Sequence, residues 1–190
     1  SIEEQPFDIL DINMGCPVPK VVNNGEGSAL LKNPELIREI VTKVSHAIKK
    51  PVTAKIRIGF EGYSVDPVEI AKIIEDSGAA AVAVHGRTRQ QYYQGHADWS
   101  VIARVKDVCS IPIIGNGDIN TPQDIIDMRE QTDCDGFMIG RGARGNPWIF
   151  RDMKYYYEHG CLPERPTAHD VKNMILRHAQ LMVEFKGEYT

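Results

Sequence analysis

The sequence Asp-Ile-Asn-Met-Gly-Cys-Pro at residues 11–17 decides between the folds that are open to this chain. It overlaps an apolar run at Phe7–Ile12, which has the composition of a buried strand, and leads into a tight turn that presents Cys16. Gly15 allows unusual backbone dihedrals and the close approach of a ligand, while Pro17 fixes the direction in which the chain leaves. Cys16 is therefore either a reactive thiol at the end of a strand or a buried apolar filler.

The rest of the chain repeats one unit, which is a short apolar strand, a polar loop and an amphipathic helix. Nearly continuous apolar runs are typical of strands that are buried on both faces of a parallel sheet. The runs are Phe7–Ile12, Val52–Ile58, Ala80–His85, Ile111–Ile114 and Gly136–Ile139. Alternation of strands and helices with short connections predicts right-handed crossovers and a parallel sheet.

The predicted helix starts share one signal, a polar N-cap residue directly before a proline at the first helical position. This signal occurs at Asn33-Pro34, Asp66-Pro67, Thr121-Pro122 and Asn146-Pro147. Glu69 follows Asp66 by three residues, which is the spacing of a capping box.

Two parallel architectures fit this alternation, a doubly wound sheet and a (β/α)8 TIM barrel. A nucleotide-binding doubly wound sheet is expected to carry Gly-x-Gly-x-x-Gly after its first strand, where this chain has Asn-Met-Gly-Cys-Pro. Polar residues and glycines follow every predicted strand, as they do at the C-terminal rim of a barrel. A complete barrel has eight βα units and roughly 250 residues. The α/β chain is therefore predicted to be a partial TIM barrel that contains the last five units.

The barrel pattern ends near residue 159, after a predicted helix at Trp148–His159. Gly160–Pro166 is rich in turn residues, and Thr167 then opens a helix with an apolar stripe. We predict a barrel part at residues 1–159. At residues 160–190 we expect a linker and the first helix of an all-helical domain.

The composition argues against a membrane protein, a metal site and a disulfide framework. No apolar run approaches the roughly 20 residues of a membrane span and no signal peptide opens the chain, so we expect a cytoplasmic protein without a membrane partner. The cysteines form no Cys-x-x-Cys pair, which argues against a metal site and a disulfide framework. The formal net charge of −4 means that a nucleic-acid partner would need a local basic patch. The chain begins with Ser1, which we interpret as the mark of a piece of a longer protein.

A barrel gathers its strand ends on one rim, so the residues there are candidates for a site. Lys55 shares a strand face with Thr53 and Arg57, and a lysine in a buried strand needs an anionic or polar ligand or a neighbouring carboxylate. His85 ends the third strand, and we place it level with Lys55 as either a ligand contact or a packed histidine.

Glycine-rich loops follow the last two predicted strands, at residues 115–118 and 140–145. Such backbone offers several N–H groups to one phosphate, although tight turns alone would also explain it. Arginines follow the strands too, at Arg57, Arg87, Arg89, Arg141 and Arg144. They indicate either a polyanion that crosses the rim or solvated loop arginines.

Several motifs together resemble the tRNA-dihydrouridine synthase family over nearly the whole chain. They are Asp-Ile-Asn-Met-Gly-Cys-Pro, Lys-Ile-Arg, Val-His-Gly-Arg-Thr, Asn-Gly-Asp-Ile and Ile-Gly-Arg-Gly, and residues 20–30 are similar to the bacterial B-type branch. The resemblance implies an FMN-binding TIM barrel followed by a helical domain that helps to hold tRNA. It also implies that NADPH reduces the flavin, which then reduces uridine in tRNA to 5,6-dihydrouridine.

The resemblance further implies a role for each candidate residue. Cys16 is the general acid that protonates C5 of the uracil after hydride transfer to C6, a role that needs a protonated thiol. The residues implied to bind the cofactor are Lys55, His85, Asn116, Gly117, Asp118, Gly140 and Arg141. Those implied to bind the substrate are Asn13, Arg57, Arg87 and Arg144.

The family's first three βα units have no counterpart in this sequence. We therefore expect the 190-residue chain to bind FMN poorly, to lack synthase activity and to self-associate through its open sheet edge, whereas the full-length enzyme is expected to be a monomer. Other functions stay open. An FMN barrel that reduces a free pyrimidine or dihydroorotate would not need the rim arginines, and a non-catalytic RNA-binding barrel would not need Cys16. A barrel that binds sugar phosphates would also leave Cys16 without a role.

Overall fold

A computed structural model describes residues 2–61 and 65–187 of the chain. Its five strands form one sheet. They are β1 (Leu10–Met14), β2 (Val52–Arg57), β3 (Ala81–His85), β4 (Ile113–Asn116) and β5 (Gly136–Met138). The α-helices are α1 (Pro19–Val22), α2 (Pro34–Ala47), α3 (Pro67–Asp76), α4 (Trp99–Val108), α5 (Pro122–Thr132), α6 (Ile149–His159) and α7 (Ala168–Lys186). Short 3-10 helices are η1 (Ile2–Glu4), η2 (Gly27–Lys32) and η3 (Arg141–Ala143).

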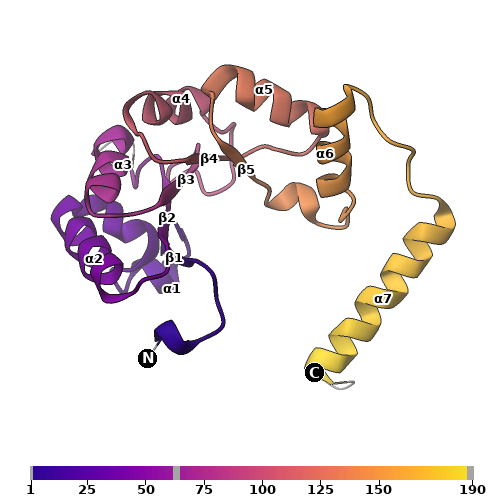
Figure 1. Cartoon of the computed structure of the whole chain (residues 1–190), viewed down its shortest axis with the longest axis horizontal. Helices are drawn as coiled ribbons and strands as arrows, with labels where there is room; N and C mark the ends of the chain where they lie inside the picture. The colour runs from indigo at the N-terminus through magenta and orange to yellow at the C-terminus, as the bar shows by residue number, and fades with distance from the viewer. Residues whose placement is uncertain (1, 62–64, 188–190) are drawn as a thin grey trace.

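The strands lie in the order β1-β2-β3-β4-β5 and every neighbouring pair is parallel. Helices α2, α3, α4, α5 and α6 pack against one another in the same sequence, and Figure 1 shows them as an arc around the outside of the strands. A doubly wound sheet would reverse its strand order and carry helices on both faces. The arrangement is therefore an arc of a TIM barrel, as predicted from the sequence.

The hydrophobic core fills the space between the sheet and the surrounding helices. Ile56 and Val82 of the strands and Ile37, Ile74 and Ile102 of the helices are all fully buried or nearly so, and they belong to one cluster. Burying each such side chain contributes about 1.5–3 kcal/mol. Because this core faces the helices, the carboxyl ends of the strands are left free to carry a site.

Two strand predictions were displaced. The first strand begins at Leu10 and not at Phe7, because Phe7 N–H bonds to the Gln5 carbonyl in a turn and pairing with β2 starts at Leu10. The fourth strand begins at Ile113 and not at Ile111, since Pro112 has no N–H and contributes only its carbonyl, which accepts from Val82.

The structure confirms three of the four predicted helix starts and contradicts the fourth. Asn33 and Asp66 cap α2 and α3 with their side chains, through the N–H groups of Leu36 at 3.1 Å and Val68 at 3.0 Å. The prediction at Asn146-Pro147 was wrong, because these residues form a preceding turn and α6 begins at Ile149.

Thr121 precedes Pro122 at the start of α5, as predicted, and its N–H donates to the Asp124 carboxylate at 2.7 Å. The capping box expected at Asp66 and Glu69 is not seen among the described residues, since the Asp66 carboxylate caps α3 by itself. Complete capping boxes occur at Thr121 with Asp124 and at Thr167 with Asp170.

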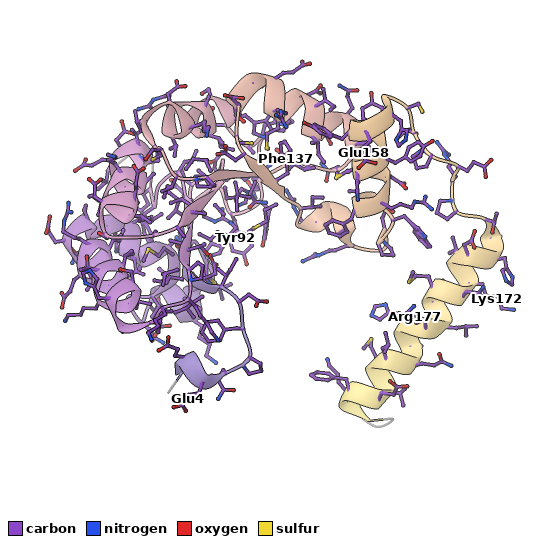
Figure 2. All side chains as sticks on the ribbon, in the orientation of Figure 1. Glu4, Tyr92, Phe137, Glu158, Lys172 and Arg177 are labelled. Carbon is purple, nitrogen blue, oxygen red and sulfur yellow. The ribbon has the colours of Figure 1, made fainter. Side chains whose placement is uncertain are left out.

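Helix α7 stands away from the sheet and its helices (Figure 1), and the side chains around it, including Lys172 and Arg177, project into open space (Figure 2). Most of its large apolar residues are exposed, with Ile175 at 63% and Phe185 at 86%. The residues described for α7 contribute nothing to the core, and the domain boundary at residue 160 stays a prediction. Among the described residues, no helix has the length and apolar character to cross a membrane.

Candidate active site

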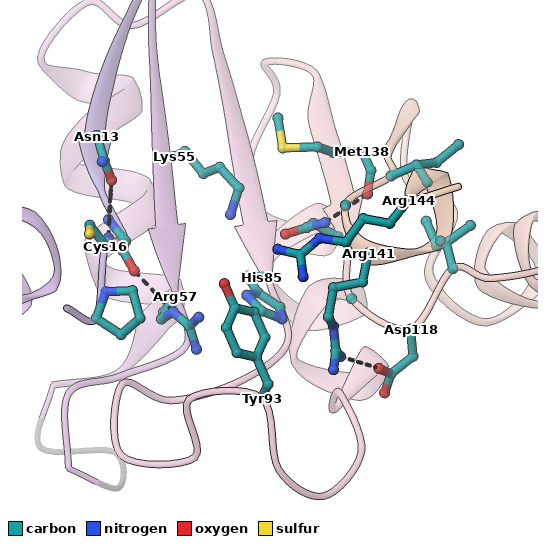
Figure 3. Close-up of a pocket in the computed structure, with 18 of the residues that line it drawn as sticks. Asn13, Cys16, Lys55, Arg57, His85, Tyr93, Asp118, Met138, Arg141 and Arg144 are labelled. Carbon is teal, nitrogen blue, oxygen red and sulfur yellow. Dashed lines mark hydrogen bonds and ion pairs between the residues drawn. The ribbon is translucent and has the colours of Figure 1, made fainter. Parts of the chain in front are cut away.

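A cavity of about 680 Å³ lies at the carboxyl ends of the strands, where the loops that follow them converge. Figure 3 shows its side chains facing one another from these loops. Every predicted site residue except Arg87 lines it: Asn13, Cys16, Lys55, Arg57, His85, Asn116, Gly117, Asp118, Gly140, Arg141 and Arg144. The predicted rim therefore forms one site, while the role of each residue stays a prediction.

The turn that carries Cys16 is fixed by side chains on both sides of it. The Asn13 amide oxygen accepts from the N–H groups of Gly15 at 3.1 Å and Cys16 at 3.0 Å. The Gly15 carbonyl accepts from Nε of Arg57 at 2.9 Å. Because its backbone is bonded in this way, the half-buried Cys16 is presented at the cavity wall by an ordered turn.

Arg57 is a buried arginine that bonds mainly to backbone carbonyls of the protein. Its side chain is buried, and Nη1 donates to the carbonyls of Thr88 and Tyr92 at 2.9 Å each. Burial lowers the pKa of this guanidinium. Arg57 thus ties the Cys16 turn to the loop after β3, in addition to lining the cavity.

Lys55 projects from β2 into the cavity (Figure 3). Within the part of the chain that the structure describes, its ammonium has no hydrogen bond or ion pair. Burial, aided by the charge of Arg57 and opposed by that of Asp11, lowers the pKa of Lys55 to about 8. The Asp11 carboxylate accepts instead from the Thr53 hydroxyl at 2.7 Å. Lys55 is therefore a cation without a bonded partner, placed where a ligand would meet it.

His85 lies at the end of β3 and is 7% exposed. It pairs in register with Arg57 and Asn116, so the expectation that it is level with Lys55 was wrong by two residues. Burial and the charges of Arg57, Lys55 and Arg87 lower the pKa of His85 to about 3. The imidazole is thus neutral at physiological pH, with one nitrogen that donates and one that accepts.

The two glycine-rich loops meet on the opposite side of the cavity from Cys16. Gly117 and Asp118 have positive φ angles of 119° and 57°, which turn the backbone sharply after β4. The Asn116 amide donates to the Met138 carbonyl at 2.7 Å and so ties this loop to β5. A Cβ added at Gly140 would meet no atom of the described chain within 4 Å, so the backbone there is open to a ligand.

Asp118 joins three loops through its carboxylate. It forms an ion pair with Arg87 at 2.7 Å and a longer one with Arg141 at 3.4 Å, and it accepts from the Ala97 N–H at 2.7 Å. Burial would raise its pKa, but the Ala97 N–H and the Arg87 guanidinium hold the pKa of Asp118 below its ordinary value. The carboxylate is thus already satisfied by protein groups.

Arg87 differs from the other rim arginines, because only 1% of it is exposed and it does not line the cavity. Its guanidinium donates to the carbonyls of Gln94 at 3.1 Å and Gly95 at 2.6 Å as well as to Asp118. The structure therefore places Arg87 beneath the rim, where it organises the loop after β3.

Tyr93 is a cavity residue that the sequence patterns did not single out. Its ring lies 4.8 Å from the Arg141 guanidinium and 5.8 Å from that of Arg57, so it separates the two arginines on the rim. Tyr92, with a positive φ of 55°, turns the backbone just before it. The one available signal was a pair of aromatic residues that follows the arginine-rich strand end.

The sequence of the chain is similar to those of known proteins. The family model for dihydrouridine synthase matches residues 1–190. The tRNA-dihydrouridine synthase B of Vibrio vulnificus is 45% identical over 187 residues, which cover 98% of this chain and 58% of that protein. That of Shewanella oneidensis is 44% identical over 186 residues, with the same coverage of both chains.

The chain thus spans 58% of the length of these curated relatives. Among solved structures, a nitroalkane oxidase from Streptomyces ansochromogenes matches 73% of this chain and 35% of its own at 17% identity, with a TM-score of 0.45. The family match covers every loop that contributes to the cavity, and the relatives confirm the resemblance to the B-type branch. The chain therefore belongs to the dihydrouridine synthase family.

Proposed function

We propose that the protein containing this chain reduces uridine in tRNA to 5,6-dihydrouridine in the cytoplasm, with FMN as cofactor and NADPH as reductant. The observation that carries this proposal is that one cavity is lined by the ordered Cys16 turn, by the Lys55 ammonium, which has no bonded partner among the described residues, and by the open backbone at Gly140. Membership of the dihydrouridine synthase family and the similarity to tRNA-dihydrouridine synthase B proteins support it.

The residues present fit a flavin that carries a phosphate. The open backbone at Gly140 and the Arg141 guanidinium would hold the phosphate, together with the backbone of Asn116 and Gly117. Lys55, on the opposite wall, would bond the pyrimidine end of the ring system and stabilise negative charge on it. His85 would lie against the cofactor as a neutral imidazole. FMN reduced by NADPH would supply the hydride that the reaction needs.

Cys16 supplies the other half of the reduction. Saturating the C5=C6 bond of uracil adds one hydride, at C6, and one proton, at C5. The thiol of Cys16 holds that proton, and the bonds of its turn to Asn13 and Arg57 orient it toward the cavity. The resulting thiolate regains a proton from solvent, so the residue returns to its initial state.

The substrate is a base in folded RNA, which must be turned out of its stack to reach the cavity. Extrusion costs a few kcal/mol, and contacts to the phosphates offset it. Arg141 and Arg144 line the rim and would make such contacts, whereas Arg57 and Arg87 would act by holding the loops. We further propose that α7 opens an all-helical domain that contacts the tRNA.

The test compares Cys16→Ala with Cys161→Ala, an exposed cysteine outside the cavity, in the full-length gene product. Cys16→Ala should leave reduction of the flavin by NADPH intact and stop formation of dihydrouridine in tRNA, while Cys161→Ala should leave both unchanged. Loss of both steps in Cys16→Ala would make Cys16 structural. Equal reduction of free uracil and of tRNA would contradict the proposed substrate.

A further inference from the structure

The carbonyl of Cys16 is held by Ser28, which follows it by twelve residues. It accepts two hydrogen bonds from Ser28, one from the N–H at 3.0 Å and one from the hydroxyl at 2.9 Å. Ser28 is fully buried, at 0% exposure, so its hydroxyl has no access to solvent. With the N–H of Cys16 bonded to Asn13, both backbone polar groups of Cys16 are fixed and its thiol is left for the cavity.

Gly27 also packs closely against Cys16. Its φ of +58° lies in the left-handed region, and an added Cβ would lie 2.8 Å from the Cys16 carbonyl oxygen and 3.0 Å from the Cys16 Cβ. It would also lie 2.9 Å from Cγ1 of Val21. Real Cβ atoms do not approach other atoms so closely, and the nearest obstacle is backbone. A side chain at residue 27 would therefore displace Cys16 itself.

We propose that Gly27 and Ser28 are positioning residues that set where the Cys16 thiol lies in the cavity. This inference rests on the proposed function, in which Cys16 delivers a proton to carbon. A proton donor acts only within hydrogen-bond reach of its acceptor, and displacement by about 1 Å costs about 100-fold in rate. The two residues touch neither the cavity nor the reacting atoms, and they act through Cys16 alone.

The chain offers a matched control at Gly25. Its φ of +80° is also left-handed, but an added Cβ there would meet nothing within 4 Å of the described chain. Gly25→Ala and Gly27→Ala thus impose similar backbone strain at positions two residues apart. Only the Cβ added at residue 27 would clash with Cys16. Comparing the two separates a positioning effect from a general loss of stability.

The first measurement is the rate at which iodoacetamide alkylates Cys16 in the 190-residue chain, in a Cys161→Ser background that removes the other accessible thiol. Gly27→Ala should change this rate by about tenfold relative to Gly25→Ala, because thiol reactivity follows exposure and surroundings. Ser28→Ala, which removes one of the two bonds, should change it by about fivefold. Equal rates in Gly27→Ala, Ser28→Ala and Gly25→Ala, all folded by circular dichroism, would overturn the proposal.

The second measurement uses the full-length gene product. Gly27→Ala should slow formation of dihydrouridine about 100-fold and leave the rate of flavin reduction by NADPH unchanged, while Gly25→Ala changes neither by more than about twofold. If Gly27→Ala does not fold, the same two rates measured for Ser28→Ala test the proposal. A wild-type protein that makes no dihydrouridine would refute the proposed function. The alkylation rates would still show whether Gly27 and Ser28 fix Cys16.

Discussion

The carboxylate of Asp118 lies 2.7 Å from the buried guanidinium of Arg87, and this ion pair joins the loop after β3 to the loop after β4. The same carboxylate accepts from the Ala97 N–H, and the indole of Trp99 donates to the Gly117 carbonyl at 3.0 Å. Two loops that carry different parts of the cavity are thus bonded to each other at several points. The family resemblance assigns Asp118 to the cofactor, and its carboxylate also bonds to Arg87, Arg141 and the Ala97 N–H.

Asp118→Asn should destabilise the chain by about 2 kcal/mol, because a buried guanidinium then loses its counter-charge. Urea unfolding of the 190-residue chain, followed by circular dichroism, measures this. Lys43→Gln is the control, since it breaks an exposed ion pair with Glu39 and should cost less than about 0.5 kcal/mol. Equal effects of the two substitutions would show that the Arg87 pair contributes no more than a surface contact.

Stability should depend on pH through His85. Its pKa is depressed from 6.5 to about 3 in the folded chain, so the unfolded chain binds a proton that the folded chain does not. The free energy of unfolding therefore falls as pH drops below 6.5, by about 1.4 kcal/mol per unit, until the pH reaches the folded pKa. Between pH 6.5 and about pH 5, His85→Asn should remove about 2 kcal/mol of this dependence. Parallel curves for wild type and variant would contradict the assigned burial.

The place of the site could be predicted from the sequence because parallel strands gather their carboxyl ends at one edge. Cys16, Lys55 and Arg141 are far apart in the chain, yet all line the cavity, as their positions at or near strand ends required. The topology of the strands alone was enough to place these residues together. The predicted barrel also agrees with the observed strand order, since a barrel places consecutive strands side by side.

The sequence did not show which of the rim arginines face the cavity, because this depends on the paths of the loops. Arg57, Arg87 and Arg144 look alike as residues at or beyond strand ends, but Arg57 and Arg87 turn inward to bond backbone carbonyls. That choice follows from backbone turns with positive φ at Tyr92 and Asp118, which no periodic pattern encodes. The level of His85 likewise depends on the offset between strands, and an error of two residues moves a side chain by one full step along the sheet face.

Lys55→Met should stabilise the chain and weaken cofactor binding. The half-buried Lys55 has a pKa of about 8, so keeping its ammonium charged at pH 7 costs free energy that an apolar side chain of similar shape does not cost. We expect a gain of about 2 kcal/mol at pH 7 in thermal unfolding of the 190-residue chain. In the full-length gene product the same substitution should lower the flavin content of the purified protein. The exposed Lys43→Met serves as control and should change neither quantity.

The 190-residue chain should self-associate, and two surfaces compete as the cause. One is the sheet, whose edge strands β1 and β5 each have one side unpaired within the described chain. The other is the exposed apolar face of α7, with Ile175 and Phe185. Sedimentation velocity over a range of concentrations should show species larger than a monomer. If Ile175→Lys with Phe185→Lys leaves these species in place, the open edge is the cause. A monomer after these two changes assigns association to α7, and a monomeric wild-type chain contradicts both.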